Sequence, residues 1–256
     1  MRATMRIAIG IEYDGTAYNG WQRQRTGVGV QQRVEQALGE VANESIEVTC
    51  AGRTDAGVHA TAQVAHFDTT AERSERGWLL GANSNLPDDI NVRWVQPVGD
   101  DFHARFSATS RSYEYRILNR LVRSALHRHR AWWVHQPLDD ARMHEAAQAL
   151  VGEHDFSAFR AAGCQASTAV RELTAISVAR DGDWLTINVT ANAFLQHMVR
   201  NITGTLVTVG MGEAPVAWLR QVLDSRDRTQ GGMAAPAHGL TLVRVTYPGN
   251  LLTIPA

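Results

Sequence analysis

The residues best suited to chemistry lie in a short loop at residues 50–60, which carries two glycines. Between those glycines stand one cation and one anion, Arg53 and Asp55. Glycine adopts the positive φ of tight turns at no steric cost, and a carboxylate on such a loop can act as a nucleophile without a cofactor. Taken alone, the loop favours a plain surface turn in which Asp55 bonds nearby backbone, because short motifs often occur by chance.

Other kinds of active site lack their sequence signatures. None of the ten histidines shows HxxxH spacing joined to a third metal ligand, and the two cysteines make no CxxC pair. The sequence has no Walker motif, no complete dinucleotide fingerprint and no GxSxG elbow. All 25 basic residues are arginine, which excludes lysine Schiff-base chemistry and suits phosphate contacts and base stacking. We therefore expect no cofactor and no metal. A metal-dependent hydrolase stays an alternative that lacks its ligand spacing.

The composition is that of an ordinary globular protein. The 256 residues are 44% hydrophobic and 20% charged, with a formal net charge of −1, and they allow one large domain or two moderate ones. No apolar run reaches the ~18 residues that cross a bilayer, and the N-terminus leads into a strand pattern rather than a signal peptide. The widely separated Cys50 and Cys164 fit a reducing compartment. The sequence therefore predicts a cytoplasmic protein with no membrane contact.

The elements that must position the glycine loop follow from the spacing of apolar residues. In the first half, alternation predicts strands and helical spacing predicts helices. Their order is strand, helix, two strands, helix and strand, the split βαβ arrangement, and the glycine loop leaves the second strand. The predicted strands cover residues 7–13, 46–50, 62–67 and 90–94, and the predicted helices cover residues 30–41 and 78–86.

The second half repeats this logic of helices on a sheet without an evident sequence repeat. Between residues 120 and 130, arginines are interleaved with histidines and two tryptophans follow, a pattern as typical of a nucleic-acid surface as of a solvated face. Residues 154–167 and 229–239 are predicted loops. The predicted strands cover residues 113–117, 172–180, 184–190 and 240–247, and the predicted helices cover residues 140–150 behind the N-cap Asp139, 194–209 and 217–223.

An acidic residue on a glycine loop, a neighbouring arginine and dispersed aromatic residues together point to cofactor-free chemistry on RNA. Residues 52–59 resemble the active-site signature of the TruA family of tRNA pseudouridine synthases. Matches in the same order extend over nearly the whole chain, at residues 12–15, 20–24, 85–87, 101–108, 111–115, 155–160, 192–202 and 239–242.

The resemblance implies a specific reaction, the conversion of uridine to pseudouridine in the anticodon stem-loop of tRNA at about positions 38–40. The N1–C1′ bond breaks, the uracil turns, and C5 bonds to C1′. No electrons or water are consumed, which agrees with the absence of cofactor motifs. Asp55 corresponds to the family's catalytic aspartate. Whether its carboxylate attacks C1′, attacks the base or acts after a glycal forms stays open.

Three further residues receive roles through the resemblance. Arg53 matches the residue linked to base flipping, and it could fill the vacated stack and pair with Asp55. Tyr113 matches the tyrosine that stacks on the flipped uracil and is a candidate for removing the C5 proton. Leu240 matches an apolar residue that would wall the uracil pocket. Without the resemblance, core packing would explain Tyr113, and it explains Leu240 equally well. His59 has no assigned role.

Two segments align with regions that contact tRNA in the family. The second departs from the family pattern, because residues 166–169 stand where relatives commonly have an arginine and a proline. The arginines of residues 120–130 could supply phosphate contacts in its place. The first segment consists of Phe102, His103, Ala104, Arg105 and Phe106, and the second of Gly163, Cys164, Gln165, Ala166 and Ser167.

We therefore expect an α+β pseudouridine synthase fold, in which two split-βαβ-like halves with mixed or antiparallel sheets flank a central active-site cleft. Residues 1–105 would form the N-terminal half with the catalytic loop, and residues 106–256 the C-terminal half with Tyr113 and the dimer and tRNA surface. The family implies a homodimer that binds tRNA and no other protein partner. A non-catalytic RNA-binding module is the remaining alternative.

Overall fold

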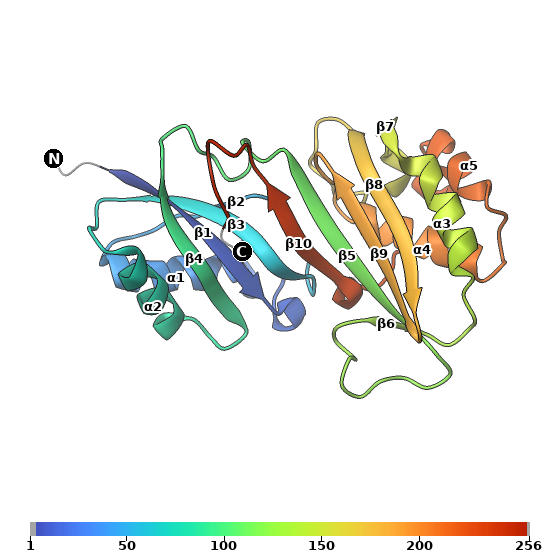
Figure 1. Cartoon of the computed structure of the whole chain (residues 1–256), viewed down its shortest axis with the longest axis horizontal. Helices are drawn as coiled ribbons and strands as arrows, with labels where there is room; N and C mark the ends of the chain where they lie inside the picture. Colours follow the sequence, from blue (N-terminus) through green and yellow to red (C-terminus); the bar gives the residue numbers. More distant parts are fainter. Residues whose placement is uncertain (1–3, 255–256) are drawn as a thin grey trace. The chain divides into compact units, whose positions relative to one another are not determined.

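Two compact units of strands and helices make up the chain. The computed structural model describes residues 4–254. Of these, residues 4–111 and 242–254 form the first unit, and Ser112–Thr241 form the second. Each unit has its own strands and its own helices (Figure 1).

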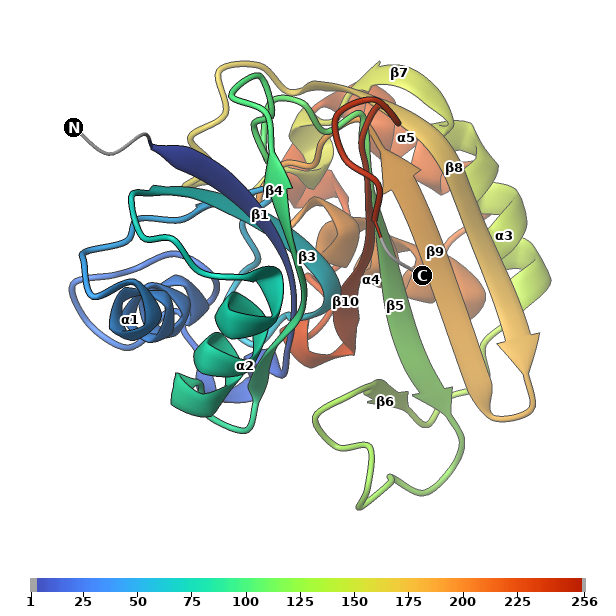
Figure 2. The ribbon, with the colours of Figure 1, turned by 60° about the vertical axis from the view of Figure 1, so that its left-hand side comes forward.

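The first unit holds an antiparallel sheet in which β1 lies between β4 and β3. The short strand β2 pairs with β3, and the C-terminal strand β10 lies next to β3. Both helices pack on the same face of these strands (Figure 2). The elements are β1 (Met5–Tyr13), α1 (Val30–Ala42), β2 (Thr49–Cys50), β3 (His59–Thr69), α2 (Glu75–Asn85), β4 (Ile90–Val98) and β10 (Leu240–Thr246).

The core of the first unit lies between this sheet and its helices. Ile9 and Ile11 of β1 are fully buried, as are Val34 and Leu38 of α1, which lie on one face of the helix at a spacing of four. Trp78 of α2 is 1% exposed and meets the ring of Phe67 in β3 edge to face. The sheet is therefore a rigid base for the loops that leave its ends.

In the second unit the strand order is β5, β9, β8 and β7, with antiparallel pairing of β7 with β8 and of β8 with β9. Strand β6 pairs with β5 in parallel, and α3 packs on β8 and contacts α4 and α5. The elements are β5 (Ser110–Asn119), β6 (Trp132–Val134), α3 (Asp140–Ala147), β7 (Gly152–Asp155), β8 (Val170–Asp181), β9 (Trp184–Ala191), α4 (Met198–Gly210) and α5 (Trp218–Ser225).

The predicted α+β class is confirmed, and so is the order of strand, helix, two strands, helix and strand in the first half. The strand predicted at residues 46–50 pairs only at Thr49 and Cys50. The backbone of Val48 is bonded instead by side chains of α1, with its N–H donating to Glu35 and its carbonyl accepting from Gln31. The apolar alternation there reports burial rather than strand pairing.

Two other boundaries differ from the sequence-based prediction. Residues 152–155 form β7 although they were expected in or beside a loop, because they are polar and their pairing with β8 leaves no apolar alternation. Helix α4 begins at Met198, since His197 takes a left-handed conformation with φ of 61° and stops the helix short of Phe194. Apolar spacing alone does not reveal either feature.

The division of the chain into an N-terminal domain of residues 1–105 and a C-terminal domain of residues 106–256 stays a prediction. Among residues 4–254, no helix combines the length and the apolar character needed to cross a membrane.

Candidate active site

The loop that carries Asp55 connects β2 to β3, and its backbone path is held by hydrogen bonds along its length. The N–H of Ala51 donates to a carbonyl of β3 at 2.7 Å. The buried side chain of Gln63 donates to the carbonyl of Gly52 at 2.7 Å, and the N–H of Trp21 donates to that of Thr54 at 3.0 Å. A loop with this many bonded backbone groups holds its main chain in a defined path.

The turn after β1 packs directly on this loop. Residues Gly15–Ala17 form a 3₁₀ turn, and a Cβ on Gly15 would lie 2.0 Å from the carbonyl oxygen of Val58, so only glycine fits there. His59 is 1% exposed. Its Nδ1 accepts from the N–H of Gly15 at 3.0 Å and lies 3.1 Å from the carboxylate of Asp14. His59, which the sequence left unassigned, thus joins the turn to the end of the Asp55 loop.

The two charged residues of the loop differ in exposure. Asp55 is half-buried, and its carbonyl accepts from the N–H of Val58 at 3.1 Å. Arg53 is exposed. Its pairing with Asp55 stays a prediction. The exposed guanidinium is placed where an incoming polyanion can reach it.

The buried Arg111 links the Asp55 loop to the first predicted RNA segment. It is 8% exposed and donates to the carbonyl of Ala51 from Nε at 3.3 Å and from Nη2 at 2.9 Å. It also donates to the carbonyl of Arg105 at 2.6 Å and to that of Ala108 at 3.1 Å. Sequence reasoning assigned Arg111 no role. A charged residue at the start of an apolar strand was the available signal.

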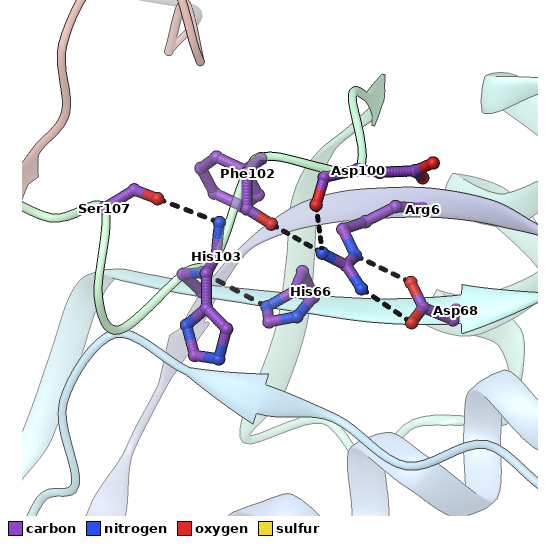
Figure 3. A network of polar contacts seen from close by, with 8 residues as sticks. Arg6, His66, Asp68, Asp100, Phe102, His103 and Ser107 are labelled. Carbon is purple, nitrogen blue, oxygen red and sulfur yellow. Dashed lines mark hydrogen bonds and ion pairs between the residues drawn. The ribbon is translucent and has the colours of Figure 1, made fainter.

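The segment of residues 102–106 is held by its main chain. Arg6 donates to the carbonyl of Phe102 at 3.0 Å, and both oxygens of Asp68 hold its guanidinium (Figure 3). The N–H of Ala104 donates to Nδ1 of His66, and its carbonyl accepts from the hydroxyl of Tyr247 at 2.6 Å. The backbone of the segment is thus fixed by side chains from several parts of the first unit.

Burial and charge set the protonation states of His66 and Asp68, which help to hold residues 102–106 in place. Burial lowers the pKa of His66 to about 4, so that its ring is neutral at neutral pH and Nδ1 can accept the N–H of Ala104. The hydrogen bonds from Arg6 lower the pKa of Asp68, which keeps that carboxylate ionised. At neutral pH, His66 is therefore neutral and Asp68 is ionised, as their hydrogen bonds require.

Because the backbone is anchored, three side chains of the segment gather together. The ring of His103 stacks on that of Phe106 with 4.3 Å between centroids, and the guanidinium carbon of Arg105 lies 5.5 Å from the Phe106 centroid. Phe106 is 76% exposed. An exposed aromatic ring beside a cation can stack on a nucleobase and contact its phosphate.

Tyr113 and Leu240 belong to the second unit, because the boundary between the units falls inside β10, between Thr241 and Leu242. Tyr113 lies on β5, is 7% exposed and meets the ring of Phe194 edge to face at 5.0 Å. Leu240 begins β10 and is 4% exposed. The contact with Phe194 ties Tyr113 to the family-like stretch at residues 192–202, a pairing that sequence reasoning missed because the two lie far apart in the chain.

The second predicted RNA segment, residues 163–167, is an irregular loop shaped by one arginine. Arg160 donates to the carbonyl of Cys164 at 2.6 Å and to that of Ala166 at 2.8 Å. Gly163, Gln165 and Ser167 are exposed. In residues 120–130, the arginines are exposed apart from the half-buried Arg120. Within residues 4–254, no group of three or more His, Cys, Asp or Glu side chains could hold a metal ion.

Known proteins are similar in sequence to this chain over most of its length. A family model described as tRNA pseudouridine synthase matches residues 9–107 and 146–248, which include the Asp55 loop and the first RNA segment. The tRNA pseudouridine synthase A of Pseudoalteromonas atlantica is 57% identical over 244 residues, 95% of this chain and 93% of that protein. The proteins of the same name from Shewanella amazonensis and Hydrogenovibrio crunogenus are 56% and 54% identical, and cover 95% and 94% of this chain and 94% and 92% of their own length.

Proposed function

Since the chain belongs to the tRNA pseudouridine synthase family, we propose that it converts uridine to pseudouridine in the anticodon stem-loop of tRNA, at about positions 38–40. The reaction exchanges the N1–C1′ bond for a C5–C1′ bond, and C5 loses one proton while N1 gains one. It needs a carboxylate, a proton acceptor and a pocket for the turning base. It does not need an oxidant or water.

The observation that carries this proposal is the placement of Asp55. Its carboxylate stands half-buried on a loop with bonded backbone, inside the stretch that the family model matches. A fixed carboxylate is pre-positioned for attack on the sugar or the base, and positioning of this kind lowers the activation barrier.

Access to Asp55 requires that the target base leave its stack, which costs a few kcal/mol. Arg53 is exposed two residues from Asp55, and its planar guanidinium can take the place of the departed base and contact the phosphates beside it. Arg53 therefore contacts the neighbouring nucleotides that stay in the stack, rather than the flipped uridine.

In the second unit, Tyr113 stacks on the flipped uracil and accepts the C5 proton, and Leu240 walls the pocket. The edge-to-face contact with Phe194 limits how the Tyr113 ring can turn, which suits a stacking surface. Residues 102–106 and 163–167 contact the tRNA outside the pocket. The protein works as a homodimer in the cytoplasm, where tRNA is its partner.

The deciding experiment follows tritium released from tRNA labelled at uridine C5. Wild type should release tritium, and Asp55→Ala should be slower by more than about 10³-fold while it still binds tRNA. Asp224→Ala removes an exposed carboxylate of α5 and should match wild type.

Two results would contradict the proposal. Full activity of Asp55→Ala would remove the carboxylate from the mechanism. Binding of tRNA by wild type without any release of tritium would favour the RNA-binding module.

A further inference from the structure

One guanidinium bonds two segments that lie far apart in the sequence. Arg111 reaches the carbonyl of Ala51, at the start of the Asp55 loop, and that of Arg105 in the first RNA segment. It also reaches the carbonyl of Ala108, two residues after that segment. Its N–H donors lie in one rigid plane, so carbonyls bonded to it hold fixed positions relative to one another.

Both segments are fixed on their other sides as well. The N–H of Ala51 is bonded to β3, and the carbonyl of Ala104 is bonded to Tyr247. If the RNA segment moved, the carbonyl of Arg105 would move with it and shift the bonded guanidinium of Arg111. The same guanidinium would then shift the carbonyl of Ala51, which lies four residues before Asp55.

We propose that Arg111 is a positioning residue for the reaction, which couples the RNA segment at residues 102–106 to the Asp55 loop so that bound tRNA sets the place of the carboxylate. The inference rests on the proposed function, because it assumes that Asp55 reacts and that residues 102–106 bind tRNA. The role proposed for Arg111 is to hold backbone carbonyls in place.

A merely structural arginine would behave differently. Loss of such a residue lowers stability, but the fraction of protein that stays folded keeps its full rate on saturating tRNA. Loss of a positioning residue lowers the rate at saturation, since a shift of about 1 Å in a reacting group can cost about 10²-fold.

The test compares single-turnover rates and half-saturating tRNA concentrations. Arg111→Ala should lose about 10²-fold or more in rate at saturating tRNA. Arg111→Lys should lose nearly as much, because one ammonium cannot span three carbonyls in the same plane. Arg6→Ala frees the same RNA segment at Phe102 without contact to residue 51, so it should raise the half-saturating concentration more than it lowers the saturating rate.

Arg180→Ala is the matched control. Arg180 also donates to a backbone carbonyl, that of Leu138, but it lies in the second unit and has no part in the proposed site. Its rate and half-saturating concentration should equal those of wild type.

Chemical rescue separates positioning from folding. Millimolar guanidinium, far below denaturing concentrations, should restore part of the rate of Arg111→Ala by occupying the space of the lost side chain. The same concentration of sodium chloride should not, and guanidinium should not rescue Asp55→Ala. If Arg111→Ala does not fold, Arg111→Lys with a native circular dichroism spectrum decides the question by its rate.

An unchanged saturating rate in folded Arg111→Ala or Arg111→Lys, with wild type active, overturns this inference and leaves the proposed function standing. A wild type that binds tRNA but forms no pseudouridine overturns the proposed function instead.

Discussion

The two cysteines of this chain are both partly exposed, but the pKa values of their thiols are shifted in opposite directions. Burial raises the pKa of the Cys50 thiol to about 12, although the charges of Arg53 and Arg105 pull it down. For Cys164, desolvation favours the neutral thiol, but hydrogen bonds from the backbone N–H groups of Ala166 and Gln196 and from Arg160 outweigh it and lower the pKa. Only the thiolate is a nucleophile, so the difference in pKa is a difference in reactivity.

We predict that iodoacetamide modifies Cys164 at least about tenfold faster than Cys50 at pH 7.5, because each unit of pKa changes the thiolate population about tenfold. Peptide mapping by mass spectrometry gives both rates. The Cys164→Ser variant should react with iodoacetamide only very slowly until the protein is unfolded, because Cys50 is then its only thiol. Saturating tRNA should slow the modification of Cys164, which lies in the second proposed RNA segment. Equal rates for the two thiols would contradict the assignment.

At the scale of elements, α4 packs against a stretch of main chain with no side chain between them. A Cβ on Gly204 would lie 1.7 Å from the carbonyl oxygen of Met233. Nearby, the N–H of Ala235 donates to the carbonyl of Arg200 at 3.0 Å, and that of Gly232 donates to the hydroxyl of Thr205 at 3.1 Å. The glycine lets the loop before β10 sit on the helix backbone.

We predict that Gly204→Ala destabilises the protein by about 1–3 kcal/mol or more, as overpacking of a filled core does. Intrinsic helix propensity favours the opposite sign, since alanine exceeds glycine by about 1 kcal/mol in a helix. The sign of the change, measured by urea unfolding, therefore tells which effect dominates.

Gly77→Ala in α2 is the control for this substitution. The nearest atom to its Cβ would be the Ser74 hydroxyl at 3.2 Å, the end of a side chain that can move. Its unfolding free energy should stay within about 1 kcal/mol of wild type. A stable Gly204→Ala would mean that the loop before β10 can leave the helix at little cost.

For the whole molecule, one buried histidine makes stability depend on pH. His66 in the folded protein has a pKa of about 4, below its ordinary 6.5, because burial disfavours the charged ring. As the pH falls from about 6.5 to about 4, the unfolded chain binds a proton that the folded chain refuses. The contribution of His66 to the unfolding free energy is therefore fully present above pH 6.5 and decreases as the pH falls from about 6.5 to about 4.

We predict that the unfolding free energy falls between pH 6.5 and 4.5, by at most about 1.4 kcal/mol per pH unit from this residue. His66→Gln can still accept the N–H of Ala104 but does not titrate, so its stability should fall less over the same range. Urea unfolding at each pH measures both curves. His135→Gln, at an exposed histidine, should follow wild type, and parallel curves for His66→Gln and wild type would contradict the prediction.

Much of the fold could be predicted because apolar spacing reports burial directly. The strand at residues 7–13 and the helices of the first half appear within a few residues of their predicted places. Spacing failed where polar side chains replaced strand pairing, as at Val48, and where one left-handed residue, His197, ended a helical pattern. At these places a single contact or a single torsion angle determines where the strand or helix ends.

The sequence by itself determined which residues could do chemistry: the glycines, Arg53 and Asp55 of one loop, within a pattern that matches a family of RNA-modifying enzymes. The tertiary structure alone decided what holds them. Arg111 lies 60 residues from Ala51 in the chain, and His59, Gln63 and Tyr247 bond backbone groups that no spacing rule connects to them. Hydrogen bonds of this kind depend on where a carbonyl points in the folded chain, which is a property of the assembled backbone and not of residue type.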